Sequence, residues 1–162
     1  MPKVSAQTVV RCACGGHAFL RMKRGVALID VADSSLLASG GWSVNEGYAQ
    51  HKIRGKLHRA IIGGDCEAID HVNHDRLDNR RQNLRPSTQQ ANQFNKKPQG
   101  GRSRYKGVTW YPEQGWVARI TRDRKRHFLG AFPTDELAAR AYDTAARRLF
   151  GEFAFLNFKE TS

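Results

Sequence analysis

The sequence predicts an α+β protein in which small antiparallel strands precede a three-stranded antiparallel sheet packed on one helix. Short runs rich in β-branched and aromatic residues, separated by turns, recur along the 162 residues. Three such runs near the C-terminus are followed by one amphipathic segment. A basic, glycine-containing segment lies between the two halves. We therefore expect domains at 1–97 and 105–162, joined by a linker at 98–104.

The first half is predicted to form short strands and helical turns that supply a core. We expect hairpin strands at 17–22 and 25–31, strands at 42–44 and 48–53, and helical turns at 34–39 and 56–62. Asp33 is placed to cap the first helical turn, which should stop at Gly40. The second should end at Gly63.

The stretch from 68 to 95 is unusually rich in Asp, Asn and His. AIDHV at 68–72 reads as a short strand, followed by the polar loop NHDRLDNRRQN. LRPS at 84–87 reads as an edge strand, because Pro86 cannot donate to a sheet ladder. STQQANQFN then predicts a helix with its N-cap at Ser87 or Thr88. The expected order is strand, loop, strand, helix.

The C-terminal half has the clearest pattern. Strands are predicted at 105–111, 116–122 and 125–132. Thr134 should cap a helix with acidic residues in its first turn, and Gly151 should end it. The helix has an apolar face for one side of the sheet.

The charge of the chain points to a polyanionic partner. The net charge is +12 and the pI is about 10.2. Nucleic acid is the first candidate and an acidic membrane surface the second. No apolar run approaches the roughly 18 residues of a membrane span, and we expect no secretory signal.

Three cysteines do not predict a disulfide framework. Cys12, Cys14 and His17 form C-x-C-x-x-H, and Cys66 is distant in sequence. A structural zinc usually takes two ligand pairs at closer spacing. We favour free thiols in a reducing cytosol over a zinc site made by these four residues.

Asp70, His71 and Asn92 are the residues best suited to chemistry. Carboxylate and amide oxygens are ligands that Mg²⁺ accepts, and a neutral imidazole can take a proton from water. A metal with a general base is a minimal set for hydrolysing a phosphodiester. On a regular strand, adjacent side chains point to opposite faces, so Asp70 and His71 can share a site only where the strand ends or bends.

The spacing Asp70-His71, then Asn83 and then Asn92, resembles the motif of HNH nucleases of the phage and intron homing type. KLHRAIIGG and IDHVNHDRLDNRRQNLR carry the same resemblance. It implies a ββα-metal domain in which Asp70 and Asn92 hold a divalent metal, Mg²⁺ or Mn²⁺. It further implies that His71 is the general base and that Asn83 fastens the loop and orients His71.

Two further histidines have open roles. Relatives in this family often carry Gly where this chain has His74, so His74 is predicted either to occupy a turn or to touch phosphate. His58 is interpreted as a packing or positioning residue rather than a second base.

YKGV, LGAF, AARAYD and LNF resemble the plant ethylene-response-factor class of DNA-binding domain. The resemblance implies that the sheet enters the major groove of double-stranded DNA. The predicted DNA contacts on the sheet are Lys106, Thr109, Tyr111, Arg119, Thr121, Arg126 and Phe128. Arg102 and Arg104 of the linker, and His74, are added to this set. The family often has Arg at 109 and 111 and an acid at 119, so a different target sequence is expected. Tyr105 and Trp116 are assigned to packing at least as readily as to base contact.

The prediction is a metal-dependent HNH endonuclease of duplex DNA, either a site-directed homing enzyme or a nickase. Its expected setting is the cytoplasm of a host, encoded by a phage or mobile element, with self-association on DNA left open. One alternative is a DNA-binding regulator whose nuclease site is vestigial. Another is an RNA-binding protein, which would need exposed stacking aromatics that the sequence does not clearly provide.

Overall fold

The computed structural model describes residues 9–38, 40–98 and 102–158. Its contacts divide the chain into two compact units, residues 1–89 and 90–162, both of mixed α+β structure. The middle of the predicted linker, 99–101, and the end of the predicted helix at 34–39 lie outside the described residues. Among the residues described, no helix is long and apolar enough to cross a bilayer.

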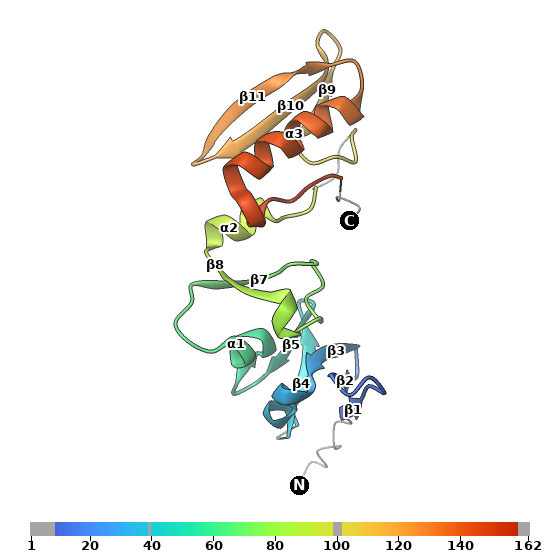
Figure 1. The fold of residues 1–162 in the computed structure, drawn as a ribbon, viewed down its shortest axis with the longest axis vertical. Coiled ribbons are helices and arrows are strands. Elements are labelled where there is room, and N and C mark those ends of the chain that lie inside the picture. The colour runs from blue at the N-terminus through green and yellow to red at the C-terminus, as the bar shows by residue number, and fades with distance from the viewer. Residues whose placement is uncertain (1–8, 39, 99–101, 159–162) are drawn as a thin grey trace. The chain divides into compact units, whose positions relative to one another are not determined.

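The first unit contains three small antiparallel sheets (Figure 1). One comprises β1 (Val9–Arg11), β2 (His17–Met22) and β3 (Gly25–Asp30), and a second comprises β4 (Trp42–Asn45), β5 (Tyr48–His51) and β6 (Gly55–Lys56). The third pairs β7 (Ala68–His71) with β8 (Leu84–Ser87). The short helices are η1 (Val31–Leu37), α1 (Leu57–Ile62) and η2 (Arg81–Asn83). The predicted hairpin at 17–31 is confirmed.

A single apolar cluster lies at the centre of the first unit. Leu20 and Ile29 from the first sheet, Trp42 from the second and Leu57 from α1 are all buried in it. Leu84 extends the cluster to the β7–β8 pair. The site-bearing hairpin therefore rests on a core that the preceding strands build.

The prediction that Asp33 caps a short helix is wrong, because the N-cap is Asp30. The helix η1 is a 3-10 helix that begins earlier, after Asp30, and Asp33 lies inside its first turn. Asp33 is buried because its carboxylate binds Arg81, with Nη2–Oδ1 at 2.7 Å and Nε–Oδ2 at 3.0 Å. A partner 48 residues away thus takes the side chain that local capping chemistry would have used.

The second unit is a three-stranded antiparallel sheet with one long helix on its face (Figure 1). It contains most of α2 (Gln89–Phe94), and β9 (Val108–Tyr111), β10 (Gly115–Arg122), β11 (Lys125–Phe132), α3 (Asp135–Phe150) and η3 (Gly151–Phe153). Thr134 caps α3 by accepting a hydrogen bond from the Leu137 amide at 3.2 Å, as predicted. β9 starts later than predicted, because Lys106 and Gly107 form a turn.

Small residues bring α3 close to the sheet. Ala138, Ala139 and Ala146 are fully buried against Val108, Ala118 and Ile120. Alanine at these contacts lets the helix lie directly on the strands, and the periodic apolar face predicted from sequence makes the contact. Tyr105 and Trp116 pack at the margin of this core.

The division between the units falls before the predicted domain limit at 97. Phe94 is the reason, because its ring stacks on Phe150 in α3 with centroids 3.8 Å apart. The end of α2 thereby belongs with the second unit.

Candidate active site and nucleic-acid interface

Asp70 and His71 occupy the end of β7. His71 is the last residue of the strand, so the strict alternation of side chains ends there. Both side chains are buried, at 9% and 6% exposure. The end of a strand is the place where the two neighbours can serve one site.

Arg85 is the cross-strand partner of Asp70, a contact the sequence analysis did not single out. The two residues are paired in the β7–β8 register. Arg85 donates to Asp70 Oδ2 from Nε at 3.0 Å and from Nη2 at 2.6 Å. Opposite charges directly across an antiparallel pair attract, so the sheet register itself creates this ion pair. The sequence signal for this contact was that Arg85 lies on the strand predicted after the one that carries Asp70.

Asn83 closes the loop that follows His71. Its Oδ1 accepts from the Asn73 amide at 2.9 Å, and its Nδ2 donates to the Asp78 carbonyl at 2.7 Å. The Val72 amide donates to the Asn83 carbonyl at 3.0 Å. One buried amide side chain thus joins both ends of the loop segment 73–83.

Local turn chemistry shapes the rest of the loop. Asn73 Oδ1 accepts from the Asp75 amide at 2.8 Å, and Asp75 Oδ1 accepts from the Leu77 amide at 2.9 Å. These are Asx turns, the reason why Asn and Asp crowd this stretch. Asp78 binds Arg80 at 2.7 Å, which holds the pKa of Asp78 below its usual value. His74 occupies the left-handed region at φ 64°, the turn position that the sequence analysis allowed.

The first sheet anchors this loop. The Leu28 amide donates to the Leu77 carbonyl at 2.8 Å, and the Asn79 amide donates to the Leu28 carbonyl at 2.7 Å. The Arg81 amide donates to Asp30 Oδ2 at 2.7 Å. The N-terminal strands therefore position the loop as well as supplying the core.

The His71 imidazole is enclosed by polar and aromatic groups. Its Nε2 lies 3.5 Å from Asn79 Oδ1, and Asn79 is only 1% exposed. The His58 ring meets it edge-on with centroids 5.1 Å apart, and the Tyr48 ring is 6.1 Å away. The contact between Asn79 and His71 was not predicted from the sequence.

Burial keeps both histidines neutral. It lowers the pKa of His71 below its usual value, against the opposing effects of Asn79 and Asp70. It lowers the pKa of His58 to about 3, with a further contribution from His71. A neutral imidazole is the form that can accept a proton. His58 packs against His71, in keeping with the packing role predicted for it.

Asn92 lies on α2 in the second unit. Its side-chain oxygen Oδ1 is buried and accepts no hydrogen bond from the residues that the structure describes. A buried amide oxygen without a partner is costly unless a ligand satisfies it. Oxygen donors such as Asn92 and Asp70 suit a hard divalent cation. No cluster of three or more His, Cys, Asp or Glu side chains suited to a metal occurs within 9–38, 40–98 and 102–158.

The three cysteines, all of which the structure describes, take part in no such cluster. Cys14 Sγ lies 3.3 Å from His17 Nδ1 in the β1–β2 turn. Hydrogen bonds from Cys12 and its neighbours lower the pKa of Cys14 to about 6. Cys66 has a separate contact, 4.0 Å from the Gly63 carbonyl.

The outer face of the sheet, opposite α3, carries most of the predicted DNA contacts. The strand register places Arg119 beside Phe128 and Thr121 beside Arg126. Thr109, Thr121, Arg126 and Phe128 are exposed, and Tyr111 and Arg119 are half-buried. Arg119 donates to the Tyr111 hydroxyl at 2.5 Å. His127 on β11 is also exposed.

Three of the other predicted contacts have partners within the second unit. Arg102 lies over the Trp110 ring at 4.0 Å, and Arg104 donates to the Tyr105 hydroxyl at 2.9 Å. Lys106 is half-buried and donates to backbone carbonyls rather than projecting from a strand. The signal for this difference was Gly107, whose positive φ of 75° makes the strand begin later than predicted.

Comparison with known proteins yields two family matches in separate segments. Residues 64–94 match the HNH endonuclease family, and residues 103–152 match the AP2 domain family. The first segment contains Asp70, His71, Asn83 and Asn92. The second contains the three-stranded sheet and all of α3.

Relatives of known sequence repeat this division. An uncharacterized HNH endonuclease of Acanthamoeba polyphaga mimivirus is 32% identical over 124 residues, which is 75% of this chain and 65% of that protein. An AP2/ERF and B3 domain-containing protein of Oryza sativa subsp. japonica is 52% identical over 56 residues, 35% of this chain and 15% of that protein. The ethylene-responsive transcription factor ERF010 of Arabidopsis thaliana is 48% identical over 58 residues, 35% of this chain and 32% of that protein.

The chain spans less than two-thirds of the length of each of these relatives. It combines a segment that matches the HNH endonuclease family with a segment that matches the AP2 domain family, the combination that the resemblances implied.

Proposed function

We propose that this protein is a metal-dependent endonuclease that hydrolyses phosphodiester bonds of double-stranded DNA, as a site-directed homing endonuclease or nickase. The observation that carries the proposal is the state of His71. It is a buried, neutral imidazole next to Asp70 at the end of β7, beside a loop that Asn83 closes. A general base requires this combination of a neutral ring and a fixed position.

Each site residue would have a separate role in the hydrolysis. Asp70 and Asn92 would hold a divalent cation, Mg²⁺ or Mn²⁺, and α2 would complete β7 and β8 as a ββα-metal site. When bound, that cation would stabilise negative charge on the scissile phosphate and the leaving oxygen. His71 takes the proton of the attacking water, and its Nε2 lies 3.5 Å from Asn79 Oδ1, a contact that helps to hold the ring in place. Asn83 keeps the loop in place.

The AP2 domain would choose where the duplex is cut. Its outer sheet face combines Arg119 and Arg126 with the exposed ring of Phe128, and α3 covers only the opposite face. Cations there can bind phosphates, and polar side chains can reach base edges. Because one chain carries one HNH site, a single copy would nick, and a double-strand break would require two copies on one duplex.

A DNA-binding regulator is the second candidate, and the Asp70–Arg85 ion pair favours it. A carboxylate already neutralised by Arg85 at 2.6 Å is a poorer cation ligand unless the arginine moves aside to a phosphate. Under this alternative, the AP2 domain binds DNA and the HNH segment only contributes positive charge and structure.

Supercoiled plasmid separates the two candidates. We expect the wild-type chain to nick it with Mg²⁺ or Mn²⁺ and not with EDTA. His71→Ala should lower nicking about 10²- to 10⁴-fold with duplex affinity unchanged, because only the proton acceptor is removed. His17→Ala, in the first unit but outside β7, is the matched control and should retain activity. Duplex binding without nicking in either metal would establish the regulator instead.

A further inference from the structure

The C-terminal end of α2 is built into the second unit. Phe94 stacks on Phe150 with the ring planes 12° apart, and the Phe155 amide donates to the Phe94 carbonyl at 3.3 Å. Gln90 Nε2 donates to Asp123 Oδ1 at 2.7 Å. A six-residue helix is too short to be stable alone in water, so these tertiary contacts hold it.

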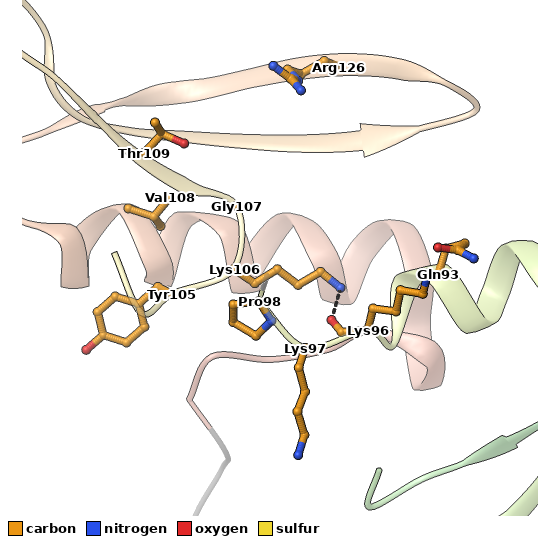
Figure 2. A pocket seen from close by; sticks show the side chains of 10 residues that line it. All are labelled: Gln93, Lys96, Lys97, Pro98, Tyr105, Lys106, Gly107, Val108, Thr109 and Arg126. Atoms are coloured by element: carbon orange, nitrogen blue, oxygen red, sulfur yellow. Dashed lines mark hydrogen bonds between the residues drawn. The ribbon is translucent and has the colours of Figure 1, made fainter. Parts of the chain in front are cut away.

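Lys106 makes the shortest hydrogen bonds to this helix end. Its ammonium donates to the carbonyl oxygens of Phe94 and Lys96, both at 2.6 Å (Figure 2 draws the bond to Lys96). The last carbonyls of a helix have no partners within the helix, and a cation there also complements the helix dipole. Burial and the nearby Lys96 lower the pKa of Lys106 to about 8, so it stays mainly charged at pH 7.

The backbone of Lys106 is fixed from the other side. Its amide donates to Asn157 Oδ1 at 2.7 Å, and Asn157 Nδ2 donates to its carbonyl at 3.2 Å. Asp143, buried in α3, accepts from both the amide and the side chain of Asn157 at 2.9 and 3.0 Å. A continuous hydrogen-bonded chain therefore runs from α3 through Asn157 and Lys106 to α2.

Lys106 contacts α2 through the hydrogen bonds of its ammonium group, and the rest of its side chain borders a pocket. Its side chain lines a pocket of about 540 Å³ together with Gln93, Pro98 and Val108 (Figure 2). The Lys106 side chain is therefore half-buried rather than enclosed on all sides. Lys97, on the same segment, points away from Lys106 in Figure 2.

We propose that Lys106 is a positioning residue that fastens α2, and with it Asn92, to the DNA-binding unit. This inference rests on the proposed role of Asn92 as a metal ligand. It assigns Lys106 to the nuclease reaction rather than to phosphate contact. The AP2 domain then both binds the duplex and presents one ligand of the nuclease site.

The test compares Lys106→Met with Lys97→Met in the full chain. Both variants remove one positive charge at nearby positions, but only the first removes the bonds to α2. Hydrogen exchange of the α2 amides, without metal, should accelerate at least about tenfold in Lys106→Met, because bonds from a charged donor are lost. The Mn²⁺ concentration for half-maximal nicking should rise about tenfold. Duplex affinity in EDTA should fall no further than in Lys97→Met, and Lys106→Arg should restore protection.

Equal exchange rates and equal metal requirements in the two methionine variants would overturn the inference. If Lys106→Met does not fold, wild-type exchange decides: α2 amides that exchange together with those of α3 support it, and α2 amides that exchange independently refute it. Wild-type protein that never nicks DNA would refute the proposed nuclease function alone. In that case hydrogen exchange still tests whether Lys106 fastens α2.

Discussion

Both units have an apolar core, but they differ in how many polar side chains they bury. The first unit buries Asp, His and Asn around its loop, and the second buries mainly alanine and other apolar residues against its sheet. The buried polar residues of the first unit are Asp33, His58, Asp70, His71, Asp78, Asn79, Asn83 and Ser87. The loop of the first unit therefore depends on hydrogen bonds being complete, whereas the second unit depends on shape. We therefore expect different substitutions and different pH changes to lower the stability of each unit.

Steric change should damage the second unit most. A Cβ added to Gly107 would lie 2.1 Å from the Tyr142 ring, and its φ of +75° already disfavours side chains. We expect Gly107→Ala to lower the free energy of unfolding of this unit by about 4 kcal/mol, through overpacking and backbone strain. Thermal unfolding followed by calorimetry measures the loss.

Gly151→Ala is the matched control in the same unit. It has a positive φ of 53° but no atom within 4 Å of the added Cβ, so only the strain of about 1–2 kcal/mol applies. If the two substitutions lower the free energy of unfolding equally, steric fit does not hold the second unit together.

Loss of one hydrogen-bonding side chain should have the next largest effect, in the first unit. Asn83→Ala leaves the Asn73 amide and the Asp78 carbonyl without this partner, and Asp78 is buried. We expect about 3 kcal/mol of destabilisation, measured by hydrogen exchange at β7 and β8, and a matching loss of nicking. Asn45→Ala, at an exposed asparagine of the same unit, should cost less than about 0.5 kcal/mol. An Asn83 variant as stable as the Asn45 variant would show that the loop is held by other means.

The same contrast explains what the sequence could predict. The second unit follows local rules: alternation gave its strands, Thr134 its helix start and Gly151 its helix end. In the first unit, local rules gave β2, β3 and α1 but not the partner of Asp33. Arg81 lies 48 residues further along, and no local pattern encodes that pairing.

The site residues divide in the same way. Asp70, His71 and Asn83 follow from spacing, but the contacts of His71 with Asn79 and His58 depend on how the loop folds back. Lys106 is the opposite case. It was predicted to contact DNA from the outer face of the sheet, whereas a turn directs its side chain to α2. Spacing in the sequence therefore indicates candidate site residues, whereas the contacts that position them depend on the folded loop and turn.

Acid should weaken the first unit selectively. The pKa of His58 is about 3 when folded and 6.5 when unfolded, so between these values the unfolded state binds a proton that the folded state does not. Stability is thus full above pH 6.5 and falls as pH decreases, by about 2 kcal/mol at pH 5. His71, whose pKa is also lowered, adds to the loss in the same direction.

Urea unfolding at pH 7 and pH 5 measures this difference. Exchange protection in β7 should fall with pH more than protection in β10. His58→Leu should flatten the dependence, because the added proton site is removed from the unfolded state. A dependence that is equal in both units would contradict the assignment to His58.

The smallest expected effect tests which face of the second unit meets DNA. Arg126 is exposed on the outer face opposite Thr121, whereas Arg148 is exposed on α3, which covers the other face. Arg126→Ala should reduce duplex affinity by about 1 kcal/mol and lower the slope of log affinity against log salt by about one, because one phosphate contact is lost. Arg148→Ala removes the same charge from the far face and should leave the slope unchanged. If both variants shift the slope equally, net charge rather than the outer sheet face governs binding, and the contrast between an interior built for chemistry and a surface built for recognition no longer holds.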